Sequence, residues 1–140
     1  MKSLRHNLPL VFFMVSLIVW PTMLYSQVDA VTSSEAQRVL EQYFSSLKNG
    51  DTSGILNLIT GPFLKKRESV LKNNAQYGDF LRERYNGANF IITPGAFMRQ
   101  NKIALRATIV FSDQQKLDLI YTFVVEGASG SLKIYSEEEL

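Results

Sequence analysis

VLEQYFSSLKNGDTSGILNLI, residues 39–59, is the stretch from which the architecture of this chain follows. Its apolar side chains recur every three or four positions, the spacing that places them on one face of an α-helix. Asn49 and Gly50 suit the left-handed backbone that ends a helix, and Asp51 can cap a helix that begins after it. The stretch therefore predicts two consecutive amphipathic helices joined by a tight turn.

The limits of these two helices follow from the residues that flank them. Thr32, Ser33 and Ser34 are alternative N-caps for the first helix, which is expected to begin after a short lead at residues 28–31. Gly61 and Pro62 are predicted to end the second helix, since neither residue favours a helix interior.

Two further helices are predicted before the strands. Residues 63–73 form the third, with four basic residues expected to face solvent: Lys65, Lys66, Arg67 and Lys72. Asn74 can cap the fourth, which ends at Asn86 and Gly87. Its predicted apolar face consists of Tyr77, Phe80, Leu81 and Tyr85.

The periodicity changes after residue 88. Residues 89–93 and 96–99 predict short strands separated by a turn at Pro94 and Gly95. Residues 102–111 and 117–125 alternate between two faces, and residues 131–136 predict a last strand. Short turns connect these strands, so neighbouring strands should be antiparallel. The acidic residues after them, Glu137, Glu138 and Glu139, are predicted to form a solvated tail.

Helices followed by an antiparallel meander predict the α+β class, with N-terminal helices packed on a curved antiparallel β-sheet. Residues 27–140 are expected to form this single domain, because a chain of this length can bury a sufficient core. The pattern indicates no internal repeat and no second domain.

The first 26 residues have the pattern of a secretory signal peptide. Lys2 and Arg5 precede an apolar run, and small or polar residues follow Pro21. Cleavage is predicted after Ser26. The alternative is an uncleaved anchor at residues 8–25, since a membrane-spanning helix needs roughly 17 to 25 residues. Either interpretation predicts that the domain lies outside the cytoplasm, in the periplasm or secreted.

Composition excludes several chemistries. The 15 basic residues include Lys2 and Arg5, whereas all 13 acidic residues follow residue 26, so the expected domain is neutral and no nucleic-acid partner is expected. The chain has no cysteine, and its only histidine, His6, lies in the N-terminal segment. Residues 27–140 therefore lack thiolate and imidazole catalysis and the usual zinc sites, and no cofactor or metal is expected.

The order of elements and the string YFSSLKNGDTSGILNLI resemble the nuclear transport factor 2-like superfamily, conical α+β domains that include ketosteroid isomerase. The matching positions are Tyr43, Phe44, Leu47, Gly50, Asp51, Ile55 and Leu58. The resemblance implies a cone that encloses a cavity. Members often dimerise through the sheet, which here suggests a homodimer surface of Arg106, Thr108, Ile120, Thr122 and Val124.

The same resemblance bears on catalysis. In ketosteroid isomerases the tyrosine that corresponds to Tyr43 donates a hydrogen bond to the substrate oxyanion, and an aspartate just after the second helix is the general base. Here the position of that base falls on Arg67, which stays protonated at working pH. Glu68 is one position out of register. The resemblance therefore implies a non-catalytic member whose apolar cone holds no general base.

Candidate ligand-binding residues come from the inner faces of the first helix and of the strand at residues 117–125: Tyr43, Phe44, Leu47, Tyr121 and Phe123. A core role is the favoured interpretation of both tyrosines, and a hydrogen bond to a ligand is the alternative. The leading functional hypothesis is a secreted or periplasmic non-catalytic domain that binds a small apolar ligand in the cone or a protein partner on the open sheet face.

Two alternatives remain at this point. One is an isomerase, dehydratase or cyclase of ketosteroid isomerase type, which would use Tyr43 with Glu68 or with a carboxylate on a strand. The other is a membrane-anchored periplasmic assembly component, similar to the periplasmic domains of type IV secretion inner-membrane proteins and held by residues 8–25. The membrane is expected as a partner only in that second case.

Overall fold

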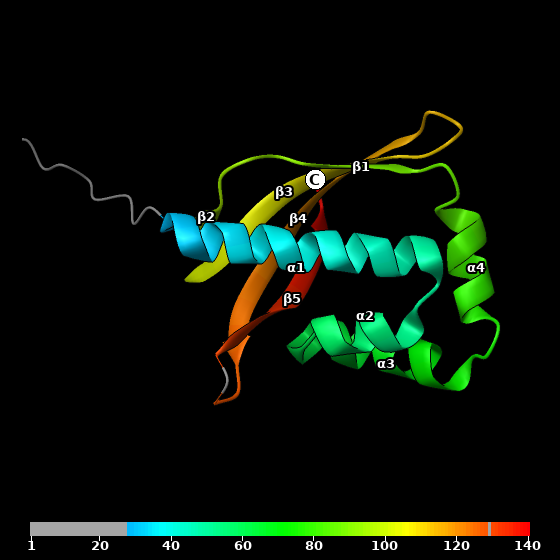
Figure 1. Ribbon diagram of the computed structural model, residues 1–140, viewed down its shortest axis with the longest axis horizontal. Coiled ribbons are helices and arrows are strands. Elements are labelled where there is room, and N and C mark those ends of the chain that lie inside the picture. Colours follow the sequence, from blue (N-terminus) through cyan, green and yellow to red (C-terminus); the bar gives the residue numbers. More distant parts are fainter. Residues whose placement is uncertain (1–27, 129) are drawn as a thin grey trace, which may run out of the picture.

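Four helices precede a five-stranded antiparallel sheet in the computed structural model, which describes residues 28–128 and 130–140 (Figure 1). The helices are α1 (Ala30–Asn49), α2 (Thr52–Leu58), α3 (Gly61–Asn73) and α4 (Tyr77–Arg84). The strands are β1 (Asn89–Ile92), β2 (Phe97–Arg99), β3 (Lys102–Val110), β4 (Lys116–Glu126) and β5 (Ser131–Glu139). The predicted α+β class is confirmed, with α1 and α3 in contact with the sheet. The cleavage site and the anchor at residues 8–25 lie outside the described residues.

Helix α1 begins earlier than predicted. Asp29 caps it, because its carboxylate accepts hydrogen bonds from the Thr32 backbone N–H at 2.8 Å and from the Thr32 hydroxyl at 2.7 Å. The prediction that Thr32, Ser33 or Ser34 is the cap is wrong, since the aspartate upstream reaches the same first-turn donor. The predicted end is confirmed, and Gly50 adopts the left-handed conformation with φ of 64°.

Helix α2 has the predicted start and a different end. The Asp51 side chain accepts a hydrogen bond from the Gly54 N–H at 2.9 Å and so caps the helix. Gly61 and Pro62 do not end α2 but open α3. Proline suits that position because a first-turn N–H has no partner within the helix.

The segment between α2 and α3 joins the helical layer to the sheet. Ile59 forms a parallel bridge with Ile134, and the Thr60 N–H donates to the Ile134 carbonyl at 2.9 Å. One edge of the sheet, strand β5, is therefore partly paired with the chain that enters α3.

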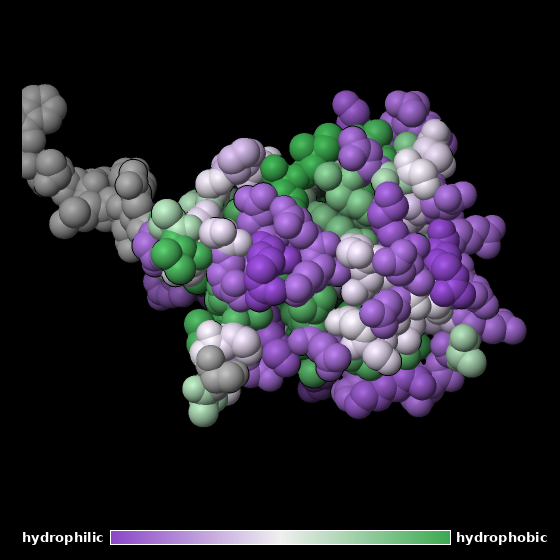
Figure 2. Space-filling model, viewed as in Figure 1, coloured by the Kyte–Doolittle hydropathy of each residue, from purple (hydrophilic) through white to green (hydrophobic). Residues whose placement is uncertain are grey.

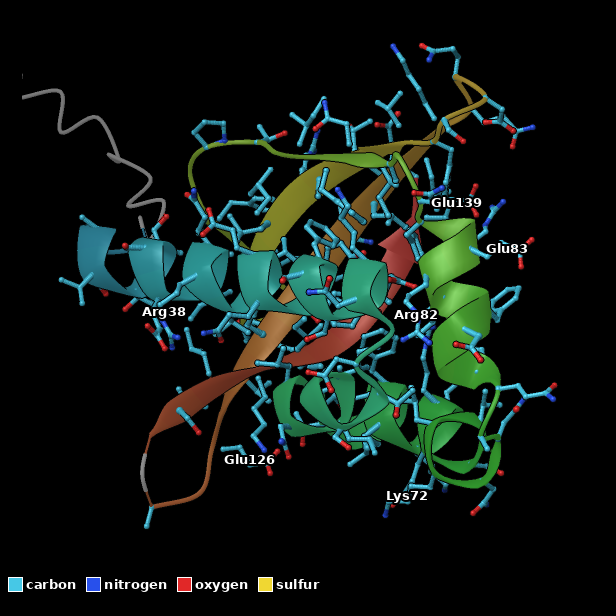
Figure 3. All side chains as sticks on the ribbon, turned by 45° about the vertical axis from the view of Figure 1, so that its right-hand side comes forward. Arg38, Lys72, Arg82, Glu83, Glu126 and Glu139 are labelled. Carbon is cyan, nitrogen blue, oxygen red and sulfur yellow. The ribbon has the colours of Figure 1, made fainter. Side chains whose placement is uncertain are left out.

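Helix α4 crosses the C-terminal end of α1 at two glycines. A β-carbon on Gly78 would lie 2.7 Å from the carbonyl oxygen of Gly50. Arg82 donates to the carbonyl oxygen of Asn49 at 3.1 Å, and Figure 3 shows it between α4 and the end of α1. Phe80 was predicted to face inward, but it is 53% exposed, because this short helix buries the side of its neighbour Leu81 instead.

The strand order is β1-β3-β4-β5, and β2 pairs with the first residues of β3. The predicted inner face of β3 is confirmed, since Leu105, Ala107 and Ile109 are buried in the core. Val125 on β4 was also predicted to face inward, but it is 62% exposed. The reason is that the β4–β5 hairpin extends beyond the helices, as Figure 1 shows.

Strand β5 contains a β-bulge. Ile134 and Ser136 pair with consecutive residues of β4, so Tyr135 between them is an extra residue. Side chains alternate between the faces of a strand, and one extra residue reverses that alternation. As a result Glu137, and not Ser136, shares the inner face with Ile134.

The core lies between the helices and the inner face of the sheet. Tyr43, Tyr121 and Phe123 are among its largest fully buried side chains. Figure 2 shows hydrophilic residues over the outward surface of α1 and hydrophobic residues in the seams beside that helix. The long first helix therefore presents a polar side to solvent and its aromatic side to the strands, as its sequence pattern predicts.

Long polar side chains occupy much of the opposite sheet face. Ile120 lies in register between Arg106 and Glu138, and Arg99 donates to Glu138 at 2.7 Å. Ile120 and Thr122, two of the residues expected to form a homodimer surface, are 1% and 4% exposed in the single chain. Little of their surface is left for a partner.

The crossing of α1 and α4 gives a stability prediction. Glycine-to-alanine substitution in a helix normally stabilises it by up to about 1 kcal/mol. We expect Gly78→Ala to destabilise the domain by about 1 to 3 kcal/mol instead, because the new methyl group would collide with the Gly50 backbone. Urea unfolding measures the change. Ser69→Ala, on the exposed side of α3, is the control, and a stabilising effect of both substitutions would contradict the close approach.

Candidate functional site

Tyr43 of α1 lies at the centre of an aromatic cluster. The centroid of its ring is 6.0 Å from that of Phe44, 6.0 Å from that of Phe63 and 5.9 Å from that of Tyr121. The residue is 0% exposed, and its hydroxyl has no hydrogen-bond partner among the described residues. A hydroxyl removed from water without a partner is rare in folded proteins and calls for an explanation.

A charged group lies next to this cluster. The Tyr121 hydroxyl donates to Glu137 Oε2 at 2.8 Å, and the guanidinium of Arg67 donates to Glu137 Oε1 at 3.0 Å. The side chains of Arg67 and Glu137 are only 25% and 20% exposed. Arg67 also lies over the ring of Phe63, at 5.1 Å from its centroid. Elements from the middle and the end of the chain thus meet at one carboxylate.

Two sequence predictions are overturned here. Glu137 is not part of a solvated tail, because β5 continues to Glu139 and the bulge at Tyr135 directs Glu137 inward, opposite Tyr121. Arg67 does not face solvent with Lys65 and Lys66, because it pairs with Glu137. The expectation of an apolar interior with no ionisable group beside the phenols is therefore wrong.

The surroundings shift the titration of both phenols. Burial raises the pKa of the Tyr43 phenol well above its ordinary value of 10.0; the nearby Glu137 carboxylate adds to the rise, and Arg67 opposes it. Burial likewise raises the pKa of the Tyr121 phenol, and again the Glu137 carboxylate adds to the rise. Both hydroxyls are thus neutral donors throughout the physiological range.

The five predicted site residues gather in one core, but they do not line an open cone. Tyr43, Phe44, Leu47, Tyr121 and Phe123 are all buried there. Of the pockets nearby, one of about 170 Å³ reaches the cluster from outside, and it is lined by Pro62, Phe63, Lys66, Tyr135, Ser136 and Glu137. Phe63 and Glu137 thus belong both to this pocket and to the surroundings of Tyr43.

The chemistry of this cluster is that of hydrogen-bond donation. Glu137 accepts a hydrogen bond from Arg67 at one carboxylate oxygen and a hydrogen bond from Tyr121 at the other. Tyr43 is the donor with no partner, and an acceptor oxygen placed at it would complete the cluster. Within residues 28–128 and 130–140, no group of three or more His, Cys, Asp or Glu residues could hold a metal ion, and no helix is long and apolar enough to cross a membrane.

The ion pair gives a second stability prediction. Glu137→Gln should destabilise the domain by about 1 to 3 kcal/mol, because it leaves a partly buried guanidinium without its counter-charge. Glu139→Gln, two residues further along β5 and exposed, should change the unfolding free energy by less than about 0.5 kcal/mol. A double-mutant cycle with Arg67→Met measures the coupling. Additive effects of the two substitutions would show that the pair contributes nothing.

The phenols give a pH prediction. Their pKa is higher in the folded chain than in the unfolded chain, so stability is complete below the unfolded value near 10 and decreases as the pH rises above it. The decrease should be about 1.4 kcal/mol per pH unit for each buried phenol. Urea unfolding between pH 9 and pH 11 measures it. Tyr43→Phe and Tyr121→Phe should each reduce this slope, and an unchanged slope in both variants would be inconsistent with buried phenols.

The α+β domain brings its candidate residues together from two helices, α1 and α3, and from two strands, β4 and β5. The aromatic part of this site was predictable from sequence, and its charged part was not. Comparisons with protein-family models, with curated proteins and with solved structures find no match for the chain.

Proposed function

We propose that this chain is an exported, non-catalytic domain of the nuclear transport factor 2-like type that binds a small, mostly apolar molecule through one acceptor oxygen. The order of elements and the sequence around Gly50 support the family, and the N-terminal signal pattern supports export. The observation that carries the proposal is the Tyr43 hydroxyl, which is buried among aromatic rings without a partner.

The energetics favour a ligand at that hydroxyl. A buried polar group without a hydrogen bond costs roughly 1 to 3 kcal/mol of stability. A phenylalanine at the same position would keep the ring contacts and avoid that cost. A ketone, ester or similar oxygen would accept the Tyr43 proton, while the rings around it would contact the apolar remainder of the ligand.

Access would come through the pocket beside Phe63. Its volume of about 170 Å³ is below the roughly 300 to 1,000 Å³ of ordinary ligand pockets. The proposed ligand is therefore small, and the Phe63 ring at the start of α3 has to move aside when it binds. Gly61, which precedes that ring, already has a left-handed φ of 56°, so the chain turns sharply there.

A ligand is favoured over a protein partner on the open sheet face. Ile120 and Thr122 of that face are buried within the single chain, and the Arg99–Glu138 ion pair lies there too. A partner would have to displace paired charges to reach apolar surface. A sheet-mediated homodimer therefore has weaker support than the ligand site.

An enzyme of ketosteroid isomerase type is the second candidate, and Glu137 is the observation in its favour. A carboxylate does lie next to the phenols, at 2.8 Å from the Tyr121 hydroxyl. As a general base it would have to accept the substrate proton at a remaining lone pair while it holds its hydrogen bonds to Arg67 and Tyr121. Clean turnover of a ketone or polyketide substrate that is lost in Glu137→Gln would favour the enzyme over the binding domain. An anchored assembly component is a third proposal. It depends on residues 8–25, which lie outside the described part of the chain.

A matched pair of ligands tests the proposed site. Acetophenone and ethylbenzene differ chiefly in one acceptor oxygen. The wild-type chain should prefer acetophenone, and Tyr43→Phe should lose that preference, a change of about fivefold in the ratio of dissociation constants. Ligand-observed NMR titration gives the ratio.

The same variant has a second readout. Because Tyr43→Phe removes an unpaired polar group, the unliganded variant should be as stable as the wild type or more stable by about 1 kcal/mol. Tyr121→Phe is the control, since it loses the hydrogen bond to Glu137 and should be destabilised. A Tyr43→Phe variant that is clearly less stable and keeps its preference for the ketone would refute the site.

A further inference from the structure

Strand β1 has a backbone edge that no described residue pairs with. It lies at the end of the strand order, and its other side pairs with β3. At the opposite end of the sheet, β5 is partly paired through Ile59 and Thr60. Strand β1 is short, with four residues, but its sequence, Asn-Phe-Ile-Ile, has neither a charged residue nor a proline, two other devices that protect an exposed edge.

The register shows which backbone groups are free. The Thr93 N–H donates to the Arg106 carbonyl at 2.9 Å, so that pair is hydrogen-bonded. Hydrogen-bonded pairs alternate along an antiparallel ladder, which makes Ile91 and Asn89 the next residues that bond to β3. The N–H and C=O groups of Phe90 and Ile92 therefore point away from β3, toward the open edge.

A groove runs beside this edge. It has a volume of about 330 Å³, and it lies between one stripe of α1 and the inner side chains of β1; its lining is Gln37, Glu41, Phe44, Ser45, Lys48, Phe90 and Ile92. Its floor is apolar, because Phe44 stacks on Phe90 with the centroids of their rings 4.3 Å apart. Phe90 and Ile92, whose backbone groups point toward the open edge, thus also line the groove with their side chains.

Charge in the groove differs between its two ends. Glu41 accepts a hydrogen bond from Gln37 at 3.0 Å. Lys48, near the C-terminal end of α1, forms no ion pair or hydrogen bond with any residue that the structure describes. Figure 1 shows that the chain enters β1 from α4, next to that end of α1. The Ser33 hydroxyl accepts from the Ala96 N–H, and Phe44 stacks on Phe90, so α1 runs opposite to β1. Lys48, one turn beyond Phe44, is therefore the groove residue of α1 nearest the Asn89 end of β1.

We propose that the open edge of β1 and the adjoining groove bind an extended segment of a partner protein as an added strand. Neighbouring strands of this sheet are antiparallel. If the added segment likewise runs antiparallel to β1, its C-terminal end lies near Lys48. Alternate side chains of a strand point to the same face, so two apolar side chains enter the groove and an acidic side chain follows two residues later. The partner pattern is apolar, any, apolar, any, acidic, and main-chain hydrogen bonds to Phe90 and Ile92 supply the rest of the recognition. The groove adjoins the Tyr43 cluster through Phe44, but its proposed contacts are the backbone of β1 and Lys48, and not the Tyr43 hydroxyl.

Two blocked peptides test the proposal on the full chain labelled with ¹⁵N. One is Thr-Val-Thr-Val-Thr-Glu-Thr, and its twin has Lys in place of Glu. In the free chain, the amides of Phe90 and Ile92 should exchange with solvent faster than that of Ile91. The acidic peptide should slow their exchange and shift their resonances, and its twin should bind about fivefold more weakly.

A charge reversal identifies the acidic contact. Lys48→Glu should weaken binding of the acidic peptide about fivefold and strengthen binding of its twin. Lys65→Glu, on α3 and away from the groove, is the matched control and should bind both peptides as the wild type does. Three results would overturn the proposal: no binding of either peptide at millimolar concentration, equal binding of both, or slow exchange at Phe90 and Ile92 before peptide is added. Protection that depends on protein concentration alone would identify a second copy of the chain as the occupant instead.

Discussion

A single carboxylate, that of Glu137, joins the helical layer of this fold to its sheet. Glu137 on the last strand binds Arg67 from the helical layer and Tyr121 from the central strand, and all three side chains are largely withdrawn from water. A charge in that position is tolerated only with its partners in place, because an isolated buried charge is strongly destabilising. This contact joins α3 to the sheet beside the ring of Phe63, together with the buried side chains of α3 and the bridge from Ile59 to Ile134.

The two buried tyrosines show how similar residues acquire different roles. Tyr121 has an acceptor within the protein and is a structural donor. The ring of Tyr43 lies 5.9 Å from that of Tyr121, and its hydroxyl has no acceptor among residues 28–128 and 130–140. Burial raises the pKa of Tyr43, and the same carboxylate that accepts from Tyr121 adds to that rise. This asymmetry between neighbours distinguishes a residue with a hydrogen-bond partner from a candidate binding residue.

Sequence periodicity predicted the helices, the strands and the aromatic core, because these follow from local spacing and from which side chains avoid water. The turn at Gly50 and the cap at Asp51 followed from backbone preferences in the same way. Glu137 could not be predicted as an inner residue, because the alternation of β5 fails at Tyr135 and nothing local marks that bulge. Arg67 lies four residues from each of the buried residues Phe63 and Leu71, so helical spacing places it on the inner side of α3. Its charge and the neighbouring lysines led to the opposite prediction.

The bridge from Ile59 to Ile134 spans more than half of the chain. During synthesis α1, α2 and α3 are made before β5. Until β5 is made, their apolar side chains and the Arg67 guanidinium lack their partners on the sheet and stay exposed to solvent. Contacts between residues this distant in sequence slow folding, and they lengthen the time for which aggregation-prone apolar surface is exposed. The domain therefore has to complete its folding after synthesis of the last strand, and a chaperone that shields residues 30–73 in the meantime would have the longest opportunity to act.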